Sequence, residues 1–230
     1  MHSGDSRRGL WTWVLGLWTW GFGFPLSAFR FRLSAFRFRL SAFVRCLVGS
    51  CLVHQVWTFQ SRLGWMAILG RDAVLKGLAF GCPSADRAVR ALRLPSRVET
   101  PRCPWNRGLV ARLQAYAAGA EDSFLDIEVD LGDATAFQRR VIDACRRIPW
   151  GSTLSYGQLA AKAGAPGAAR AVGRCMAANR IPLIIPCHRV LGADGGLHGY
   201  SGPGGLATKR RLLELEGAWR NRAGFCREER

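Results

Sequence analysis

Acidic residues are scarce in this chain of 230 residues: 16 aspartates and glutamates stand against 33 lysines and arginines, giving a formal net charge of +17. This excess is larger than a solubilising surface requires. We therefore expect a polyanionic partner, either nucleic acid or an acidic membrane face. The excess is not confined to one end, because residues 1–55, with seven arginines and one aspartate, hold only part of it.

Paired cysteines are also missing, since the eight cysteines include no Cys-x-x-Cys and show no paired spacing. The sequence does not indicate a disulfide framework, and a reducing compartment fits this usage better. Several cysteines fall in apolar helical patterns that predict buried structural thiols. A structural zinc ion is an open alternative, but no ligand spacing supports a metal site.

Residues 1–55 repeat themselves, and the heptad at 26–32 recurs unchanged at 33–39. A heptad of aromatic residues and arginines without acids is not a coiled-coil pattern. Three interpretations stay open: a twin-arginine export signal, a membrane anchor interrupted by glycines and a proline, or a non-native extension from an upstream start codon. We favour the extension, since export would separate the protein from the substrate inferred below.

Residues 56–132 predict a small α/β domain without obvious chemistry. Ser84 is the expected cap of one helix, and Gly119 the expected stop of another. Alternation of apolar and acidic residues at 124–131 predicts a half-buried strand. The predicted elements are strands at 63–69 and 73–80, helices at 85–94 and 107–118, a proline-marked loop between them, and the strand at 124–131.

Residues 133–219 predict a mainly helical domain, followed by a basic tail at 220–230. Capping boxes at 135–138 and 155–158 open two helices, and Pro166 is expected in the first turn of a third that runs to about Ala178. The second and third helices form a predicted helix-turn-helix. The third has an exposed face of alanine and glycine that suits close approach to a surface, with Arg170 and Arg174 left for phosphates or the base stack. An ordinary alanine-rich packing helix is the alternative.

The most informative segment is Pro186-Cys187-His188-Arg189-Val190, which follows the apolar run 181–185. The run predicts a buried strand or a tight connector that ends at an activated cysteine. A neighbouring base or cation lowers the pKa of a thiol and makes it a better nucleophile. A bare Cys-His pair is a weak signal alone, and it is also compatible with a cysteine hydrolase.

Several short segments occur in one order around this pair. The chain resembles the methylated-DNA–protein-cysteine methyltransferases from about 135 to 217, more weakly from 63 to 131, and not at all in residues 1–55. The segments that carry the resemblance are Ser155-Tyr156, Ala169-Arg170-Ala171-Val172-Gly173, Asn179, Pro182, Pro186–Val190, Gly199-Tyr200-Ser201 and Leu213–Gly217.

The resemblance implies a fold and a reaction. The fold is a small ribonuclease-H-like sheet-and-helix domain followed by a winged-helix-like alkyltransferase domain. The reaction is a single irreversible transfer of an alkyl group from the 6-oxygen of guanine in duplex DNA to Cys187, without cofactor or metal. Whether the 4-oxygen of thymine is accepted stays open. The implied protein is a cytoplasmic monomer that does not bind membranes.

The resemblance also implies roles for single residues. His188 would take the thiol proton, Glu216 would orient His188, and Tyr156 would protonate the departing guanine. Arg170 would fill the gap left by the rotated nucleotide. Other DNA contacts would come from Ala169, Ala171, Gly173, Arg174 and Asn179, and the substrate pocket would be formed by Pro182, Val190, Tyr200 and Ser201.

This chain departs from the family pattern at three places. Arg180 follows Asn179 where proline is common, which predicts a looser turn. The loop 200–206 is longer than usual, which weakens the placement of Ser201. His198 lies where the family commonly has a small residue, and we interpret it as a solvated loop histidine. Taken singly, Tyr156 could be a core aromatic, Glu216 a solvated carboxylate and Asn179 a helix stop.

The remaining alternatives to alkyl transfer are a non-catalytic module that binds alkylated DNA and an exported or membrane-bound basic protein.

Overall fold

The computed structural model describes residues 54–92, 94 and 105–219. The repetitive extension lies outside these residues except for its last two positions. The proline-marked loop at 95–104 and the basic tail at 220–230 also lie outside them. Within the described part of the chain, no helix combines the length and the apolar character needed to cross a membrane.

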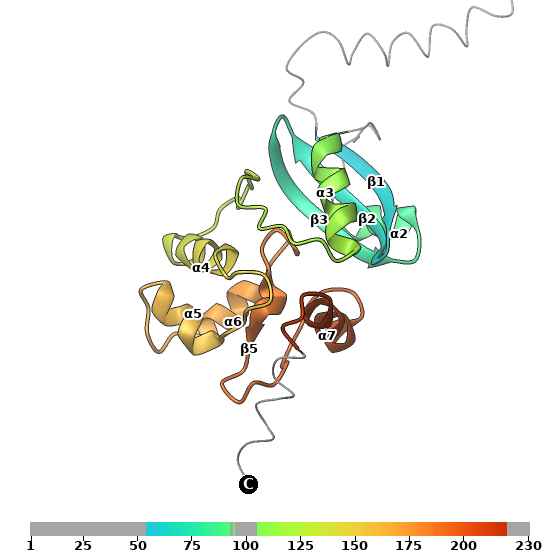
Figure 1. The fold of residues 1–230 in the computed structure, drawn as a ribbon. Coiled ribbons are helices and arrows are strands. Elements are labelled where there is room, and N and C mark those ends of the chain that lie inside the picture. The colour runs from blue at the N-terminus through green and yellow to red at the C-terminus, as the bar shows by residue number, and fades with distance from the viewer. Residues whose placement is uncertain (1–53, 93, 95–104, 220–230) are drawn as a thin grey trace, which may run out of the picture. The chain divides into compact units, whose positions relative to one another are not determined.

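The N-terminal half contains a three-stranded antiparallel sheet in the order β1-β2-β3 (Figure 1). The strands are β1 (Gln55–Ser61), β2 (Gly64–Arg71) and β3 (Val74–Cys82). Both predicted strands are present as β2 and β3. Sequence alternation did not predict β1, because its buried residues Val56 and Phe59 are three positions apart rather than two.

Two helices cover opposite faces of this sheet, as the alternation of side chains along β2 dictates. Met66 and Ile68 join the main core with α3 (Arg107–Ala117), whereas Ala67 on the other face packs with Ala88 of α2 (Ala85–Ala91). Ser84 caps α2 as predicted, although this helix ends three residues earlier than expected.

The predicted strand at 124–131 is wrong for most of its length. Only its end pairs with β3: Leu75 N donates to Glu128 O at 2.9 Å, and Asp130 N donates to Leu75 O at 2.8 Å. The carbonyls of Phe124, Leu125 and Ile127 accept from Nη2 of Arg146 instead. Phe124 has a φ of +50° and Leu125 is 51% exposed, so the segment is a loop held by a guanidinium.

The C-terminal half is mainly helical, as predicted. Both capping boxes are present, at the starts of α4 (Ala136–Arg146) and α5 (Tyr156–Lys162). The third helix, α6 (Ala169–Ala177), begins three residues after Pro166, which lies in the preceding turn rather than in the first turn of the helix. The two-residue strands β4 (Leu154–Ser155) and β5 (Val190–Leu191) pair in parallel, and α7 (Gly205–Leu215) follows.

Backbone and side-chain contacts join the two halves. Leu78 N of β3 donates to Arg180 O at 3.0 Å, and Tyr116 of α3 reaches Glu216 just after α7. The main hydrophobic core is continuous across both halves. The turn that carries Cys187 is therefore held by the sheet as well as by the helices around it.

The close approach of Trp105 to Gly70 gives a test of the N-terminal packing. A Cβ at Gly70 would lie 2.1 Å from the Trp105 ring, so Gly70→Ala should lower the free energy of unfolding by about 1–3 kcal/mol. The matched control is Gly108→Ala at an exposed position of α3 that has room for a methyl group, where we expect no loss and up to about 1 kcal/mol of gain. Urea unfolding measures both, and equal stabilities would show that the Trp105 ring does not sit on Gly70.

Candidate active site around Cys187

A tight connector, not a strand, delivers Cys187 to the site. Ile185 N donates to Ile181 O at 3.0 Å, and the short 3-10 helix η1 (Cys187–Arg189) follows directly. Leu183 in this turn has a φ of +72°, a conformation that costs a non-glycine residue about 1–3 kcal/mol. Of the two predictions for this run, the tight connector is confirmed.

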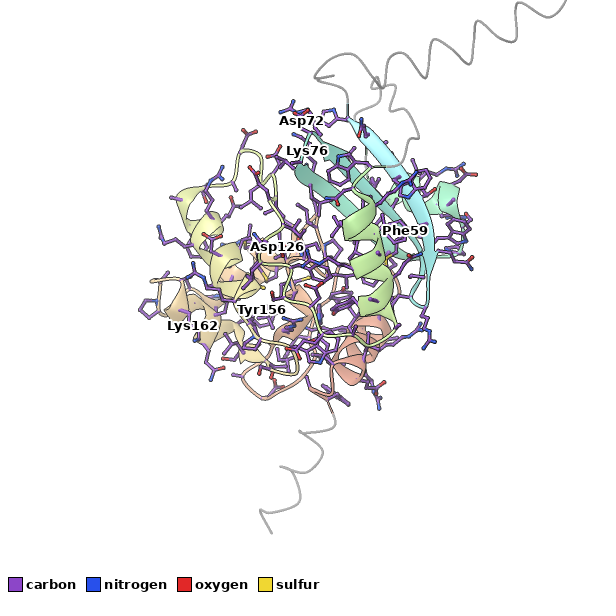
Figure 2. All side chains as sticks on the ribbon, turned by 45° about the horizontal axis from the view of Figure 1, so that its top comes forward. Phe59, Asp72, Lys76, Asp126, Tyr156 and Lys162 are labelled. Carbon is purple, nitrogen blue, oxygen red and sulfur yellow. The ribbon has the colours of Figure 1, made fainter. Side chains whose placement is uncertain are left out.

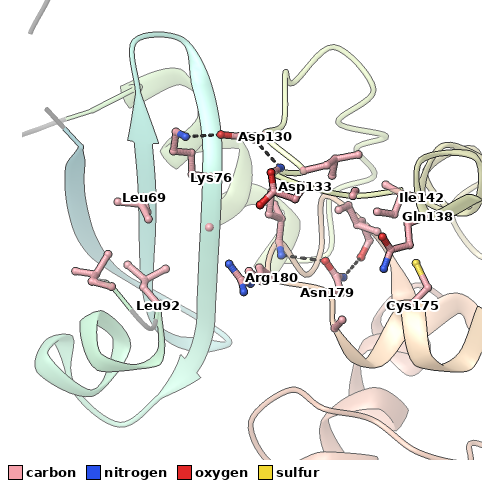
Figure 3. A pocket seen from close by; sticks show the side chains of 18 of the residues that line it. Leu69, Lys76, Leu92, Asp130, Asp133, Gln138, Ile142, Cys175, Asn179 and Arg180 are labelled. Atoms are coloured by element: carbon pink, nitrogen blue, oxygen red, sulfur yellow. Dashed lines mark hydrogen bonds and ion pairs between the residues drawn. The ribbon is translucent and has the colours of Figure 1, made fainter. Parts of the chain in front are cut away.

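Asn179 braces the turn through three contacts. Its Nδ2 donates to Ile185 O at 2.9 Å and to Cys187 Sγ at 3.3 Å, and its Oδ1 accepts from Ile181 N at 2.9 Å. Asn179 also lines a cavity of about 540 Å³ between β3 and the C-terminal half, beside Arg180 and the Lys76–Asp130 ion pair (Figure 3). Arg180 does not loosen the turn, because its backbone carbonyl is tied to β3.

The thiol of Cys187 is 6% exposed, and this burial raises its pKa above the ordinary value. The hydrogen bond from Asn179 and the positive charge of Lys209 act in the opposite direction. No hydrogen bond joins Sγ to the ring of His188 in the described structure. The Nε2 atom of His188 bonds to a different partner. The role of His188 as acceptor of the thiol proton stays a prediction.

That partner is the carboxylate of Glu216, which is buried rather than solvated. His188 Nε2 lies 2.9 Å from Oε1, and Tyr116 donates to the same oxygen at 2.5 Å. Arg189 donates from Nε to Oε2 and from Nη2 to Oε1, both at 2.9 Å. Burial opposes the charge on Glu216, but its bonds to His188 and Arg189 outweigh that effect and lower its pKa to about 2.

The ring of His188 is completely buried, and this burial lowers its pKa despite the carboxylate beside it. A neutral ring whose Nε2 faces an ionised carboxylate carries its proton on Nε2. Its Nδ1 is buried and has no hydrogen-bond partner among the described residues. The geometry thus provides a neutral imidazole with one lone pair free to accept a proton.

Lys209 of α7 is a second buried cation near the thiol. Its Nζ donates to Val190 O and to Leu197 O, both at 2.6 Å, and lies 5.8 Å from the centre of the Tyr156 ring. Burial lowers the pKa of Lys209 to about 8, and the nearby Cys187 acts against this shift. A lysine without a carboxylate partner among the described residues is available to stabilise negative charge that develops on sulfur.

A cavity of about 720 Å³ opens beside Cys187. Tyr156 occupies the first position of α5, while Lys162 at the other end of that helix points outward (Figure 2). The phenol oxygen of Tyr200 is buried there without a hydrogen-bond partner in the described structure, and burial raises its pKa. The lining residues include Tyr156, Ala169, Arg170, Gly173, Met176, Cys187, His198, Tyr200 and Ser201.

Two of the predicted pocket residues do not belong to this lining. Val190 is completely buried, and its carbonyl accepts from Lys209, so it supports the cavity from behind. Pro182 lies in the connector, where it bridges to Ile185. His198 lines the cavity but is also half-exposed and pairs with Asp194, in agreement with a loop histidine.

The exposed face of α6 continues the cavity wall. Ala169, Ala171 and Gly173 are only partly buried, and Arg170 and Arg174 are exposed without an ion-pair partner among the described residues. The two arginines are four positions apart and so lie on one side of the helix. Of the predicted DNA-contacting residues, Ala169, Arg170 and Gly173 line the cavity, whereas Asn179 donates to the thiol.

Sequence reasoning missed three residues of the site. Arg189 belongs to the motif that it singled out, but it received no role. Lys209 is a lone cation at a position of α7 that packs inward. Tyr116 follows Leu109 and Leu113 at the spacing of a buried helix face, so it was indistinguishable from core. Sequence reasoning found no obvious chemistry in the N-terminal half, yet Tyr116 of that half donates to Glu216.

The buried charge of Glu216 predicts a pH-dependent contribution to stability. The pKa of Glu216 is lowered from 4.5 to about 2, so its contribution is complete above pH 4.5 and disappears as the pH falls toward 2. Glu216→Gln leaves Arg189 without its counter-charge and should cost about 3–5 kcal/mol at pH 7. The difference from wild type should shrink below pH 4.5.

Glu214→Gln is the matched control, because Glu214 is exposed and pairs only with Arg210 on the surface. We expect its effect to stay within about 1 kcal/mol at every pH. Denaturant unfolding across the pH range measures both variants. Equal stability of Glu216→Gln and wild type at pH 7 would contradict a buried, ionised Glu216.

Comparisons with known proteins agree with this site. The family model for the 6-O-methylguanine DNA methyltransferase DNA-binding domain matches residues 136–218. A methylated-DNA–protein-cysteine methyltransferase of Mycolicibacterium paratuberculosis is 46% identical over 162 residues, which cover 69% of this chain and 90% of the relative. Its counterpart in Mycobacterium leprae is 54% identical over 160 residues, with the same coverage.

The fold agrees as well. The crystal structure of Mycobacterium tuberculosis OGT in complex with DNA is 43% identical, covers 70% of this chain and 92% of its own, and superposes with a TM-score of 0.59. The resemblance found in the sequence is thereby confirmed. With its mixed α/β fold, its small antiparallel sheet and its buried Cys187, the chain belongs to the methylated-DNA–protein-cysteine methyltransferase family.

Proposed function

We propose that this protein repairs DNA by moving an alkyl group from the 6-oxygen of guanine in duplex DNA to Sγ of Cys187. The observation that carries the proposal is a buried cysteine in the wall of a 720 Å³ cavity, beside a neutral histidine that is oriented by a buried carboxylate. The sulfur–carbon bond formed is a stable thioether, so each molecule acts once.

The proton movements follow from the site. Nδ1 of His188 is the acceptor without a partner, and it takes the thiol proton through a water molecule. Lys209 and Asn179 stabilise the thiolate, which attacks the alkyl carbon as the carbon–oxygen bond breaks. The electron pair of that bond leaves with guanine, and the Tyr156 hydroxyl donates a proton to a guanine ring nitrogen.

DNA binding is assigned to the helix-turn-helix formed by α5 and α6, within a winged-helix-like half. The small residues of α6 allow the DNA backbone to approach closely, and the net charge of +17 favours binding of the phosphates. Arg170 lines the cavity and is exposed, which suits a side chain that replaces the everted nucleotide. The crystal structure of the Mycobacterium tuberculosis relative is a complex with DNA, which agrees with this assignment.

Other assignments complete the proposal. Residues 56–132 form the ribonuclease-H-like domain and residues 133–219 the DNA-binding and active-site domain. Residues 1–55 are a repetitive extension, and residues 220–230 are a basic tail. Pro182 and Val190 support the pocket that Tyr200 and Ser201 close. The protein acts as a monomer in the cytoplasm, where chromosomal DNA is reached.

Methyl transfer is the direct test. Incubating the full chain with duplex DNA that contains O6-methylguanine should add the mass of one methyl group, less a hydrogen, to the peptide of Cys187. Cys187→Ser should abolish the transfer. Cys175→Ser should retain it, because Cys175 lies on the wall of the other cavity. Binding of methylguanine DNA without any mass gain would instead support a non-catalytic module.

Arg170→Ala tests the eversion step. Loss of the side chain that fills the base stack should slow transfer from duplex DNA by about tenfold or more, since each 1.4 kcal/mol corresponds to tenfold in rate. Transfer from the free base O6-benzylguanine, which needs no eversion, should change less than twofold. Arg210→Ala on α7 is the control for general loss of positive charge. Equal slowing on both substrates would contradict the role of Arg170.

A further inference from the structure

The N-terminal half supplies a residue to the reaction network. Resting on the proposed alkyl transfer, we propose that Tyr116 is a positioning residue. Its hydroxyl holds Oε1 of Glu216 beside Nε2 of His188, so that the imidazole keeps its proton on Nε2 and leaves Nδ1 free for the thiol proton. Tyr116 lies in α3, outside the residues 136–218 that the DNA-binding family model matches.

The position of the Tyr116 ring is set by helix α3 and by the rings of Trp150 and Phe124. Tyr116 is completely buried at the end of the apolar face of α3. The ring of Trp150 meets it edge-on with centroids 5.2 Å apart, and the ring of Phe124 lies at 5.7 Å. Phe124 is itself fixed by the loop that Arg146 holds. A ring packed on these sides has little freedom, so the position of its hydroxyl is set by the fold.

The hydroxyl has one chemically consistent orientation. A carboxylate can only accept, so Tyr116 donates its proton to Glu216 Oε1 at 2.5 Å. The phenol oxygen of Tyr116 also lies 3.4 Å from His188 Nε2, where its lone pair faces the N–H of the ring. The N–H at Nε2 thus faces two acceptor oxygens, Oε1 of Glu216 and the phenol oxygen of Tyr116. Both favour the tautomer that leaves Nδ1 unprotonated.

Oε1 of Glu216 is shared among three donors, which are His188, Tyr116 and Arg189. The phenol therefore withdraws negative charge that would otherwise act more strongly on the imidazole. Without it, the carboxylate would favour the imidazolium form more strongly, and that form cannot accept the thiol proton. The other charged or titratable groups around His188 are Cys187, Arg189 and Lys209, all in the C-terminal half. Of these, Arg189 also donates to Oε1.

The test is the pH dependence of single-turnover methyl transfer in the full-length protein. Tyr116→Phe keeps the ring and removes the hydroxyl. We expect the acid limb of the rate profile to move about half to one pH unit toward higher pH, with a rate on the alkaline plateau within about twofold of wild type. Below the limb, the rate should fall about threefold to tenfold.

Leu113→Val is the matched control, since Leu113 is equally buried on the same helix and its side chain has no polar atom that could join the hydrogen-bond network. It should lower the melting temperature without moving the acid limb. A purely structural role for Tyr116 predicts the same behaviour for Tyr116→Phe. Superimposable limbs for wild type and a folded Tyr116→Phe would overturn the proposal.

A second variant decides the matter if Tyr116→Phe does not fold. Incorporation of 3-fluorotyrosine at position 116 preserves shape and hydroxyl but makes the phenol a stronger donor. The acid limb should then move toward lower pH, opposite to the phenylalanine variant, and an unmoved limb would overturn the role. Absence of methyl transfer in the wild-type protein would instead refute the proposed function itself.

Discussion

The carboxylate of Glu216 is the interaction on which the rest of the site depends. A buried anion is costly unless charged and neutral donors surround it, and here His188, Arg189 and Tyr116 all point at its two oxygens. These donors come from α3 and from η1, while Glu216 itself ends α7. One ionised group thus fixes the relative placement of three segments that lie far apart in sequence. If it were neutral, Arg189 would be a buried cation without an anion.

This arrangement separates the orientation of the base from the activation of the nucleophile. His188 follows Cys187 in sequence, yet its Nε2 pairs with Glu216, and no hydrogen bond joins its ring to the thiol among the described residues. The groups that act directly on sulfur are Asn179 and Lys209. Because burial raises the pKa of the thiol, Cys187 stays mostly protonated until a proton acceptor is in place. For a protein proposed to react once, low reactivity toward stray electrophiles is an advantage.

Local signals in the sequence predicted the helices, whereas the predicted roles of the site residues came from the family resemblance. Capping residues such as Thr135 and Ser155 mark helix starts independently of tertiary contacts, and both predictions are correct. The strand at 124–131 failed because Arg146, which is distant in sequence, takes the carbonyls that a neighbouring strand would need. Tyr116 escaped notice for a similar reason. Its partner is 100 residues away, and nothing in an apolar helix face distinguishes a packing tyrosine from one that donates to a buried carboxylate.

The same helix serves the proposed DNA surface and the wall of the cavity. Ala169, Arg170 and Gly173 line the cavity, and Arg170 is also exposed on α6. A duplex docked against this face would present its nucleotides at the mouth of the cavity, with Cys187 in the opposite wall. A larger side chain at Gly173 would obstruct both the docking and the entry of a base, because a Cβ there would already touch the Tyr156 ring at 4.0 Å. The small residues of α6 would therefore serve both proposed functions, close approach of the duplex and entry of a base into the cavity.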